Sequence, residues 1–241
     1  MLNLYVTSCR KKEGKTFITA GIAATMQSLG YKTSVYKPVQ TSGIELSGFT
    51  QSPDLTYIKT IDPYIETSFS YVFKSDNEPL IAAENENLYI DTDVILKDYQ
   101  KASSTSECVI ADGDCGILSP IAVNQQNIDI IKKLQTPVLF VVSPNENSVN
   151  DILLAINAAC ERGAIINGVV INNIKENENN TNLTSLIRII EEYTNVKVLG
   201  LVPNLGKKLM PEELITGILN GIDIESVFNV KIEKLDFGQW L

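Results

Sequence analysis

The sequence predicts an α/β fold, in which a parallel β-sheet carries helices on both faces, as a single domain over residues 1–241. Two observations predict this fold. Short apolar segments alternate with amphipathic segments along the chain, as strands and helices do in parallel sheets. The first apolar segment, residues 2–6, runs through small polar residues into Gly14-Lys15-Thr16, which opens a segment with apolar residues at helical spacing.

Residues 8–16 have the features of a phosphate-binding loop, or P-loop. Such a loop aims backbone N–H groups and a helix N-terminus at phosphate oxygens, with a lysine on the β- and γ-phosphates and a hydroxyl on Mg²⁺. Lys15 and Thr16 fit the last two roles. The general motif has glycine where this chain has Cys9, and a form one residue longer has glycine where this chain has Ser8. The order of strand, loop and helix favours a P-loop NTPase-type sheet over a glycine turn that only starts a helix.

The composition and the apolar pattern argue against nucleic acid and membrane as binding partners. The net charge of −9 argues against a nucleic-acid-binding surface, and the basic triplet Arg10-Lys11-Lys12 lies in the loop, where phosphate is the expected partner. No apolar run approaches the roughly 20 residues of a membrane span, and the N-terminus lacks the layout of a signal peptide. We therefore expect a cytoplasmic protein that binds neither nucleic acid nor membrane.

The chain has no histidine, which excludes Ser-His and Cys-His nucleophiles and every histidine-ligated metal site. The four cysteines show no C-x-x-C spacing, so we expect them to be reduced and structural. They are Cys9, Cys108, Cys115 and Cys160.

The remaining elements follow in alternation. Gly30 is expected to end the first helix, and residues 32–37 are expected to form a strand that ends at Pro38. Residues 40–50 are predicted as a mobile loop and residues 64–89 as an irregular region with a helical excursion at the sheet edge. Further strands are predicted at residues 107–112, 137–143, 168–172 and 197–202. Further helices are predicted to start at Ser52-Pro53-Asp54 and to span residues 91–102, 149–163, 183–193 and 212–220.

Three segments fall outside that alternation. Residues 113–116 are expected to form a glycine turn after the strand 107–112. The Asn-rich residues 177–182 are expected to form an exposed loop. Residues 224–241 form a C-terminal tail whose structure the sequence leaves uncertain.

Four polar residues are expected to meet at the carboxyl edge of the sheet, where open α/β sheets bind ligands: Lys15, Lys37, Asp112 and Asn172. Lys37 reaches the same site as Lys15 there, or is a solvated surface lysine. Asp112 ends a buried strand, which favours a Mg²⁺ ligand of the Walker-B type over turn chemistry. Asp54 is either a helix-capping residue or a Mg²⁺ ligand. Asn172 reads an adenine through its amide, or favours the turn.

Together these motifs resemble the dethiobiotin synthetase family, P-loop enzymes of biotin biosynthesis, from the first strand to about Pro203. Ser8 to Thr16 have the length of the family loop Gly-Thr-Asp-Thr-x-Val-Gly-Lys-Thr. Further matching stretches are Tyr36-Lys37-Pro38-Val39-Gln40-Thr41, Ser52-Pro53-Asp54, Asp112-Gly113-Asp114-Cys115-Gly116 and Gly168 to Asn172. The chain differs from the family at Lys11, where the family has threonine, and at Glu146 to Asp151, where it has Leu-Gly-x-Ile-Asn-His.

The resemblance implies a homodimer with 7,8-diaminopelargonate across its interface, and ATP and CO2 or bicarbonate as co-substrates. Carbamate formation, phosphorylation by ATP and closure of the ureido ring would follow. The implied catalytic residues are Lys11, Lys15 and Lys37. The implied nucleotide-binding residues are Lys12, Glu13, Gly14, Lys15, Thr16, Phe17, Asn172 and Pro203. Substrate contacts are implied for Lys37, Thr41 and Asn150, and Mg²⁺ binding for Thr16, Asp54 and Asp112.

Two other classes of function remain as alternatives. The altered loop and the acidic Glu146 and Asp151 are compatible with a nucleotide-binding regulatory module that has lost ring closure. Arg10 lies where partition-type P-loop ATPases have a signature lysine, but the adjoining pair of glycines is absent.

Overall fold

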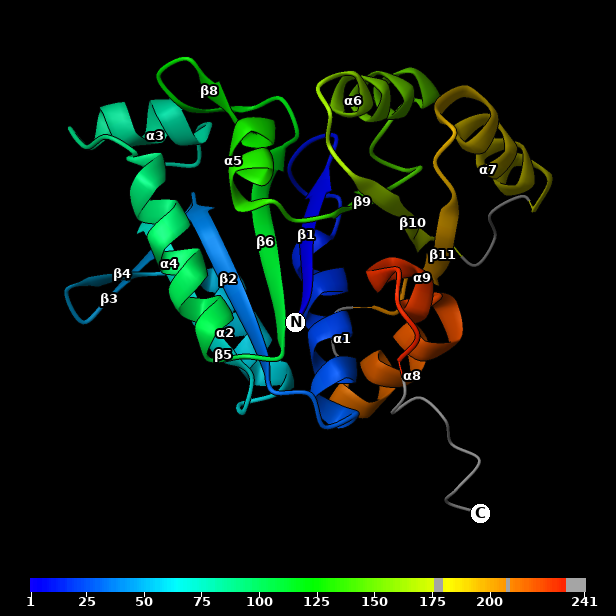
Figure 1. The fold of residues 1–241 in the computed structure, drawn as a ribbon, viewed down its shortest axis with the longest axis horizontal. Helices are drawn as coiled ribbons and strands as arrows, with labels where there is room; N and C mark the ends of the chain where they lie inside the picture. The colour runs from blue at the N-terminus through cyan, green and yellow to red at the C-terminus, as the bar shows by residue number, and fades with distance from the viewer. Residues whose placement is uncertain (176–179, 207–208, 233–241) are drawn as a thin grey trace.

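A seven-stranded sheet forms the centre of the molecule in the computed structural model, which describes residues 1–175, 180–206 and 209–232. The strands are all parallel, in the order β11-β10-β9-β1-β6-β2-β5 (Figure 1). They span β1 (Leu2–Ser8), β2 (Thr33–Gln40), β5 (Glu66–Val72), β6 (Cys108–Gly116), β9 (Val138–Val142), β10 (Ile166–Ile174) and β11 (Val198–Pro203). The predicted α/β fold with a parallel sheet is confirmed.

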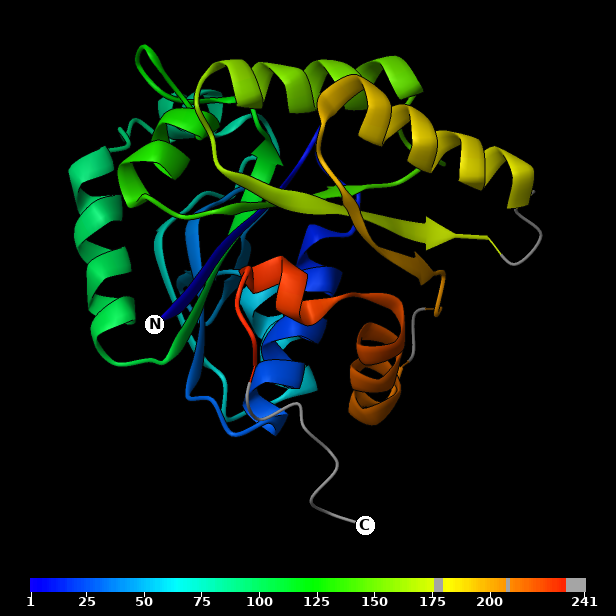
Figure 2. The same ribbon diagram turned by 45° about the vertical axis from the view of Figure 1, so that its right-hand side comes forward.

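Helices cover both faces of this sheet (Figure 2). One face carries α3 (Pro79–Asn85), α4 (Thr92–Ser104), α5 (Asn127–Leu134), α6 (Val149–Glu161) and α7 (Asn180–Thr194). The other face carries α1 (Lys15–Ser28), α2 (Pro53–Ile61), α8 (Pro211–Gly221) and α9 (Ile224–Phe228). The sheet is therefore buried on both sides, which explains why its central strands read as continuous apolar runs.

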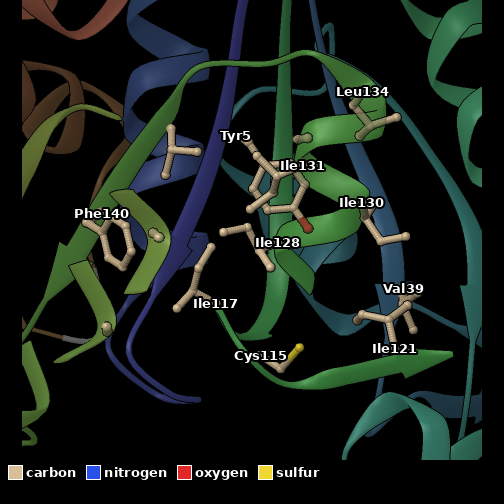
Figure 3. Close-up of a cluster of buried hydrophobic side chains, with 14 of the residues drawn as sticks. Tyr5, Val39, Cys115, Ile117, Ile121, Ile128, Ile130, Ile131, Leu134 and Phe140 are labelled. Carbon is tan, nitrogen blue, oxygen red and sulfur yellow. The ribbon is translucent and has the colours of Figure 1, made fainter. Parts of the chain in front are cut away.

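The core beneath α5 holds β1 in place. Ile128 and Ile131 of α5 lie beside Tyr5 of β1, and all three side chains are buried (Figure 3). The Tyr5 hydroxyl donates a hydrogen bond of 2.6 Å to Oδ1 of Asn127, so its polar tip is satisfied inside the core. α5 follows a short pair of strands, β7 (Pro120–Ala122) and β8 (Gln125–Gln126), and the sequence analysis predicts none of these three elements.

The prediction of an irregular region over residues 64–89 is wrong for residues 66–72, which form the edge strand β5. Residues 66–72 pair with β2 rather than forming irregular structure, and β5 is the last strand at one edge of the described sheet. Its residues are mostly polar and none is fully buried, so the apolar run that signals a buried strand is missing. The helical part of the expectation is met by α3.

Two strands continue beyond their predicted ends. β2 runs through Pro38 to Gln40, and the register on β5 passes from Lys37 opposite Phe69 to Val39 opposite Tyr71, so the missing N–H interrupts pairing only at Pro38. β6 includes residues 113–116, which are strand and not the predicted glycine turn.

Two predicted loops contain regular structure. Within residues 40–50, β3 (Ile44–Leu46) begins an antiparallel hairpin with β4 (Phe49–Gln51). Its two turn residues, Ser47 and Gly48, have φ of 53° and 82°, as a type I′ turn requires. Within the Asn-rich stretch, residues 180–182 belong to α7, whereas residues 177–179 lie outside the described residues.

The C-terminal region is placed as far as residue 232. α9 packs through Ile224, Val227 and Phe228 onto the sheet face that also carries α1. The rest of the predicted tail, residues 233–241, lies outside the described residues. No helix in the described part of the chain has the length and apolar character needed to cross a membrane. The assignment of residues 1–241 to one domain stays a prediction.

Candidate functional site

The loop between β1 and α1 turns with two residues in the left-handed region. Lys12 and Gly14 have φ of 68° and 87°, whereas neither Ser8 nor Cys9 has a positive φ. A Cβ on Gly14 would lie 2.1 Å from Nδ2 of Asn172, so glycine is required there by backbone conformation and by space. The positions where the general motif has glycine thus adopt backbone conformations open to serine and cysteine.

Lys15 begins α1 and folds back over this loop. Its Nζ donates to Oγ of Ser8 over 2.9 Å and to the carbonyl oxygen of Arg10 over 3.1 Å. The side chain is buried, and burial together with the charge of Lys37 lowers the pKa of the Lys15 ammonium, against the opposing pull of Asp112. Lys15 is therefore a weakly solvated cation at the helix N-terminus, where an anion is favoured.

Lys37 bridges two carboxylates at the carboxyl end of β2. Its Nζ lies 2.5 Å from Oδ2 of Asp54 and 2.8 Å from Oδ2 of Asp112, and its side chain is fully buried. Burial alone lowers the pKa of a lysine, but the charges of Asp112 and Asp54 outweigh burial and raise the pKa of Lys37. The surface-lysine alternative is wrong, because Lys37 has no contact with solvent.

Two threonines of α1 orient Asp112. Thr16 Oγ1 donates to Oδ2 of Asp112, and Thr19 Oγ1 donates to its Oδ1, each over 3.0 Å. The Asp112 side chain is fully buried at the end of the central apolar part of β6. The sequence analysis does not single out Thr19, although its position one helical turn after Thr16 places both hydroxyls on one side of α1.

The donor set beside the loop fits Mg²⁺. The hydroxyl of Thr16 and the carboxylates of Asp54 and Asp112 are hard oxygen ligands, and Mg²⁺ is commonly held by one or two carboxylates together with substrate phosphates. In the described part of the chain there is no group of three or more Cys, Asp or Glu side chains able to hold a metal. Phosphate oxygens would therefore have to complete the coordination.

A cavity of about 350 Å³ opens in front of these residues, and we call it the loop cavity. Its walls include six residues from four parts of the chain: Lys11, Lys15, Thr16, Thr41, Asp54 and Asp114. The structure thus brings together Lys11 and Lys15, the predicted threonines and one of the predicted carboxylates at a single cavity. Lys37 and Asp112 lie directly behind it, through their contacts with Asp54 and Thr16.

Asp114 is a site residue that the sequence analysis places in a turn and gives no role. It accepts hydrogen bonds from Thr41 Oγ1 over 2.6 Å and from Gln40 Nε2 over 3.2 Å. Lys11 Nζ lies 3.8 Å from its Oδ2. The alternation of β6 could have identified it, because residues 112 and 114 project to the same face of a continued strand.

A second cavity, of about 200 Å³, lies on the other side of the loop, and we call it the asparagine cavity. The lining residues that the sequence analysis names are Lys12, Glu13, Gly14, Phe17, Asn172 and Pro203. Asn172 Nδ2 donates to the carbonyl oxygen of Glu13 over 3.0 Å, which leaves its Oδ1 as an acceptor. Six of the eight predicted nucleotide-binding residues therefore line this cavity, and the other two, Lys15 and Thr16, line the loop cavity.

Glu13 carries a buried carboxylate within the loop. Its Oε1 accepts from the Arg10 backbone N–H over 2.7 Å and from Asn147 Nδ2 over 3.2 Å, whereas Oε2 is buried and has no hydrogen-bond partner among the described residues. Burial raises the pKa of this carboxyl, although both hydrogen bonds act to lower it.

Asn150 is the predicted site residue that the structure does not bring to either cavity. It lies exposed in the first turn of α6, next to the Ser148 cap of that helix. The four cysteines are free, as predicted, but Cys160 is exposed rather than buried on the inner face of α6.

Residues 2–212 of this chain match the model of the family AAA_26, which is described as an AAA domain. The protein belongs to this family.

Three curated relatives have similar sequences over most of their length, and each is named ATP-dependent dethiobiotin synthetase. The relative from Akkermansia muciniphila is 28% identical over 203 residues, which are 83% of this chain and 91% of the relative. That from Bacillus licheniformis is 28% identical over 95% of this chain and 97% of the relative. That from Bacillus subtilis (strain 168) is 26% identical over 95% and 98%. The resemblance found in the sequence is confirmed.

Solved structures share the fold at lower identity. The MinC:MinD cell division protein complex of Aquifex aeolicus matches with a TM-score of 0.54 and 16% identity, over 91% of this chain and 88% of that chain. A ParA family ATPase from Chlorobium tepidum matches with a TM-score of 0.52 and 15% identity, over 95% and 93%. At these identities the likeness concerns the fold alone.

Proposed function

We propose that this protein is an ATP-dependent dethiobiotin synthetase, which converts 7,8-diaminopelargonate, CO2 and ATP into dethiobiotin in biotin biosynthesis. The observation that carries the proposal is the arrangement of Lys15, Thr16 and Asp54 around the loop cavity, with Lys37 and Asp112 directly behind them. The names of the curated relatives support the same activity.

The reaction begins when one amine of the diamine forms an N–C bond to CO2 and releases a proton, which gives a carbamate. A carbamate oxygen then takes the γ-phosphoryl group of ATP, and ADP leaves. The second amine attacks the carbonyl carbon, inorganic phosphate leaves, and the ureido ring closes. Each step before ring closure concentrates negative charge, so the catalytic requirement is a set of fixed cations and N–H donors.

Lys15 and Lys37 supply these fixed cations. Lys15 exchanges its contacts with Ser8 and Arg10 for phosphate oxygens of ATP, and the N–H groups at the start of α1 face the same phosphates. Lys37 stays protonated because Asp54 and Asp112 raise its pKa. Its ammonium stabilises the carbamate and the phosphoryl group that the carbamate receives. Lys11 also lines the loop cavity and adds positive charge there.

Thr16, Asp54 and Asp112 are the proposed ligands of Mg²⁺. When bound, Mg²⁺ neutralises charge on the β- and γ-phosphate oxygens. The asparagine cavity takes the adenine, with Asn172, Pro203 and Phe17 around the ring and residues 12–14 beside the phosphates. The Oδ1 of Asn172, for which no hydrogen-bond donor is found among the described residues, suits an exocyclic amino group such as that of adenine.

We also propose a homodimer in the cytoplasm. Asn150 is exposed at the start of α6, away from both cavities of its own chain, and would hold the substrate carboxylate of a second copy. In this arrangement each diamine lies between the loop cavity of one protomer and α6 of its partner.

The test is phosphate release and mass detection of dethiobiotin by the purified protein with Mg-ATP and bicarbonate, with and without 7,8-diaminopelargonate. Dethiobiotin that appears only with the diamine supports the proposal. Lys15→Ala is expected to abolish product formation, because it removes the phosphate-facing ammonium. Tight ATP binding without any dethiobiotin would contradict the proposal and favour the regulatory module.

A further inference from the structure

Lys11 places its ammonium in a ring of oxygen acceptors, which we call the ammonium cradle. The Nζ atom lies 2.8 Å from Thr41 Oγ1 and 2.8 Å from each of the carbonyl oxygens of Asp76 and Asn77. Asp114 Oδ2 is 3.8 Å away. Three hydrogen bonds is the number that one primary ammonium donates, so the cradle matches this group in both geometry and charge.

Two acceptors of the cradle, Thr41 and Asp114, are oriented by hydrogen bonds that do not involve Lys11. Thr41 donates its hydroxyl hydrogen to Asp114 over 2.6 Å, so only the lone pairs of Oγ1 face Lys11. Gln40 donates to the other oxygen of Asp114 over 3.2 Å, and Ser52 in turn donates to Gln40 over 2.6 Å. Gln40, Thr41 and Ser52 are buried, so this network is fixed by the end of β2 and the start of α2.

Within the described part of the chain, no cation is hydrogen-bonded to the carboxylate of Asp114. Its side chain is only 7% exposed, and the distance of 3.8 Å to Lys11 Nζ is too long for a hydrogen bond. A carboxylate offers about four lone-pair sites, and Thr41 and Gln40 occupy two of them. The cradle can therefore bind an ammonium that approaches Asp114 more closely than Lys11 does.

Lys11 itself is a replaceable occupant. Its side chain is 26% exposed, and it reaches the cradle from the P-loop on a long aliphatic stem, whose ordering costs conformational entropy. A bound amine would release that stem. The Lys11 ammonium would then remain in the loop cavity, beside Lys15, where the carbamate forms.

We propose that the ammonium cradle binds one amino group of the acceptor substrate, and that Lys11 fills the cradle only while the acceptor is absent. This inference rests on the proposed function for the identity of the acceptor, a vicinal diamine. Lys11 thereby competes with the substrate for Thr41, Asp76, Asn77 and Asp114. Asp114 is the residue that selects a cationic amine over a neutral or anionic group.

The test is calorimetric titration of the full-length protein with 7,8-diaminopelargonate, without nucleotide. Substitutions of Lys11 and Asp114 should change the affinity for the diamine in opposite directions. Lys11→Met keeps the stem and removes the competitor, so the diamine should bind about tenfold more tightly. Asp114→Asn keeps the shape and removes the charge, so the diamine should bind about tenfold more weakly, as loss of a charge-assisted hydrogen bond predicts.

Lys12→Met is the matched control for Lys11→Met. It removes the same charge from the neighbouring loop residue, which lines the same cavity but makes no hydrogen bond to the cradle among the described contacts. General electrostatic attraction of a cationic ligand would rise equally in both variants, whereas competition is relieved only in Lys11→Met. Equal affinities of these two variants, or weaker binding by Lys11→Met than by the wild type, would overturn the proposal.

Two further measurements keep the inference separable from the proposed function. Thr41→Val removes one cradle acceptor without a charge change and replaces Asp114→Asn if that variant does not fold, with weaker binding again expected. A wild-type protein that forms no dethiobiotin contradicts the proposed function alone, and the cradle is then tested with 2,3-diaminobutane in place of 7,8-diaminopelargonate. The same order of affinities supports the cradle, and binding that is absent or independent of Asp114 overturns it.

Discussion

Lys37 Nζ donates a hydrogen bond of 2.8 Å to Oδ2 of Asp112, although 75 positions separate the two residues in the sequence. The contact exists because β2 and β6 are neighbours in the sheet and both end at its carboxyl edge. Both side chains are completely buried, so neither charge is screened by water. The pair therefore links the stability of the sheet to the chemistry of the site.

Replacing Lys37 by methionine should separate these two roles. The variant is expected to lose at least about a hundredfold in kcat, because one fixed cation is removed from the developing charge. It should also lose about 3 kcal/mol of stability, because Asp112 is left buried and unpaired. ATP affinity should change by less than about threefold, since Lys15 and the loop are intact. Denaturant unfolding, steady-state kinetics and nucleotide titration measure the three quantities.

The double variant Lys37→Met/Asp112→Asn serves as its control. Removal of the unpaired charge should restore most of the lost stability, while dethiobiotin formation stays absent. A single Lys37→Met variant that keeps wild-type turnover would show that Lys37 is a structural cation only.

Substitution of Thr16 by valine tests the proposed metal ligands. Valine keeps the shape but removes the hydroxyl that faces the loop cavity, so affinity for Mg-ATP should fall about tenfold. Affinity for ATP measured in a chelator should stay within about twofold of the wild type, because the phosphate-facing N–H groups are unchanged. Thr19→Val is the matched control. It removes an equal hydrogen bond of 3.0 Å to Asp112 from a position that does not line the cavity. Equal losses in both variants would assign Thr16 to the support of Asp112 alone.

Replacement of Gly14 by alanine is expected to cause a steric clash, and the same replacement at Gly48 serves as the control. Gly14→Ala forces an L side chain to φ of 87° and places its Cβ 2.1 Å from Asn172 Nδ2. Gly48→Ala in the β3–β4 turn has the same backbone strain at φ of 82°, but nothing lies within 4 Å of its Cβ. Each should lose about 1–2 kcal/mol from backbone strain. Only Gly14→Ala should lose further stability and ATP affinity, and thermal unfolding with nucleotide titration compares the two.

Asn172→Ala in the Gly14→Ala background should recover part of that further loss, because the clashing amide is gone. No difference between the two glycine variants would mean that Asn172 can move away without cost.

The buried carboxyl of Glu13 is expected to make the stability of the folded protein depend on pH. Burial raises the pKa of this carboxyl, so the folded protein holds its proton more tightly than the unfolded chain does. The corresponding stability is fully present below the ordinary glutamate pKa of about 4.3 and is lost as pH rises through the raised value. Relative to Glu13→Gln, the wild type should therefore lose stability as the pH rises from about 4.3 through the raised pKa of this carboxyl. Urea unfolding of both proteins across this range measures the difference, and parallel curves would contradict the prediction.

The sequence predicted those parts of the site that have local signals. The strand, loop and helix around Lys15 are contiguous, and Lys37 and Asp112 each end a buried apolar strand, so their meeting follows from a parallel sheet. β5 was missed because an edge strand half exposed to solvent does not need apolar residues. The contacts of Lys11 with Asp76 and Asn77 were missed because they join the loop to a segment 65 residues away that has no regular structure.

Asp114 illustrates a second cause of failure. The Asp-Gly-Asp-Cys-Gly stretch has turn residues, and only the register of β6 against Ser8 of β1 shows that the strand continues to Gly116. Pairing between strands more than a hundred positions apart overrides the local preference of glycine and aspartate.

The position of β1 in the sheet also bears on how the protein is made. β1 precedes the other strands of the described sheet in the chain, and in that sheet it pairs only with β6 and β9, which begin at Cys108 and Val138. Until those segments are synthesised, both edges of this apolar strand stay open to other chains. The P-loop that β1 carries therefore cannot take its final form until more than half of the chain exists. Truncated chains that end before β6 should aggregate, and during translation the protein is expected to depend on chaperones that shield unpaired strands.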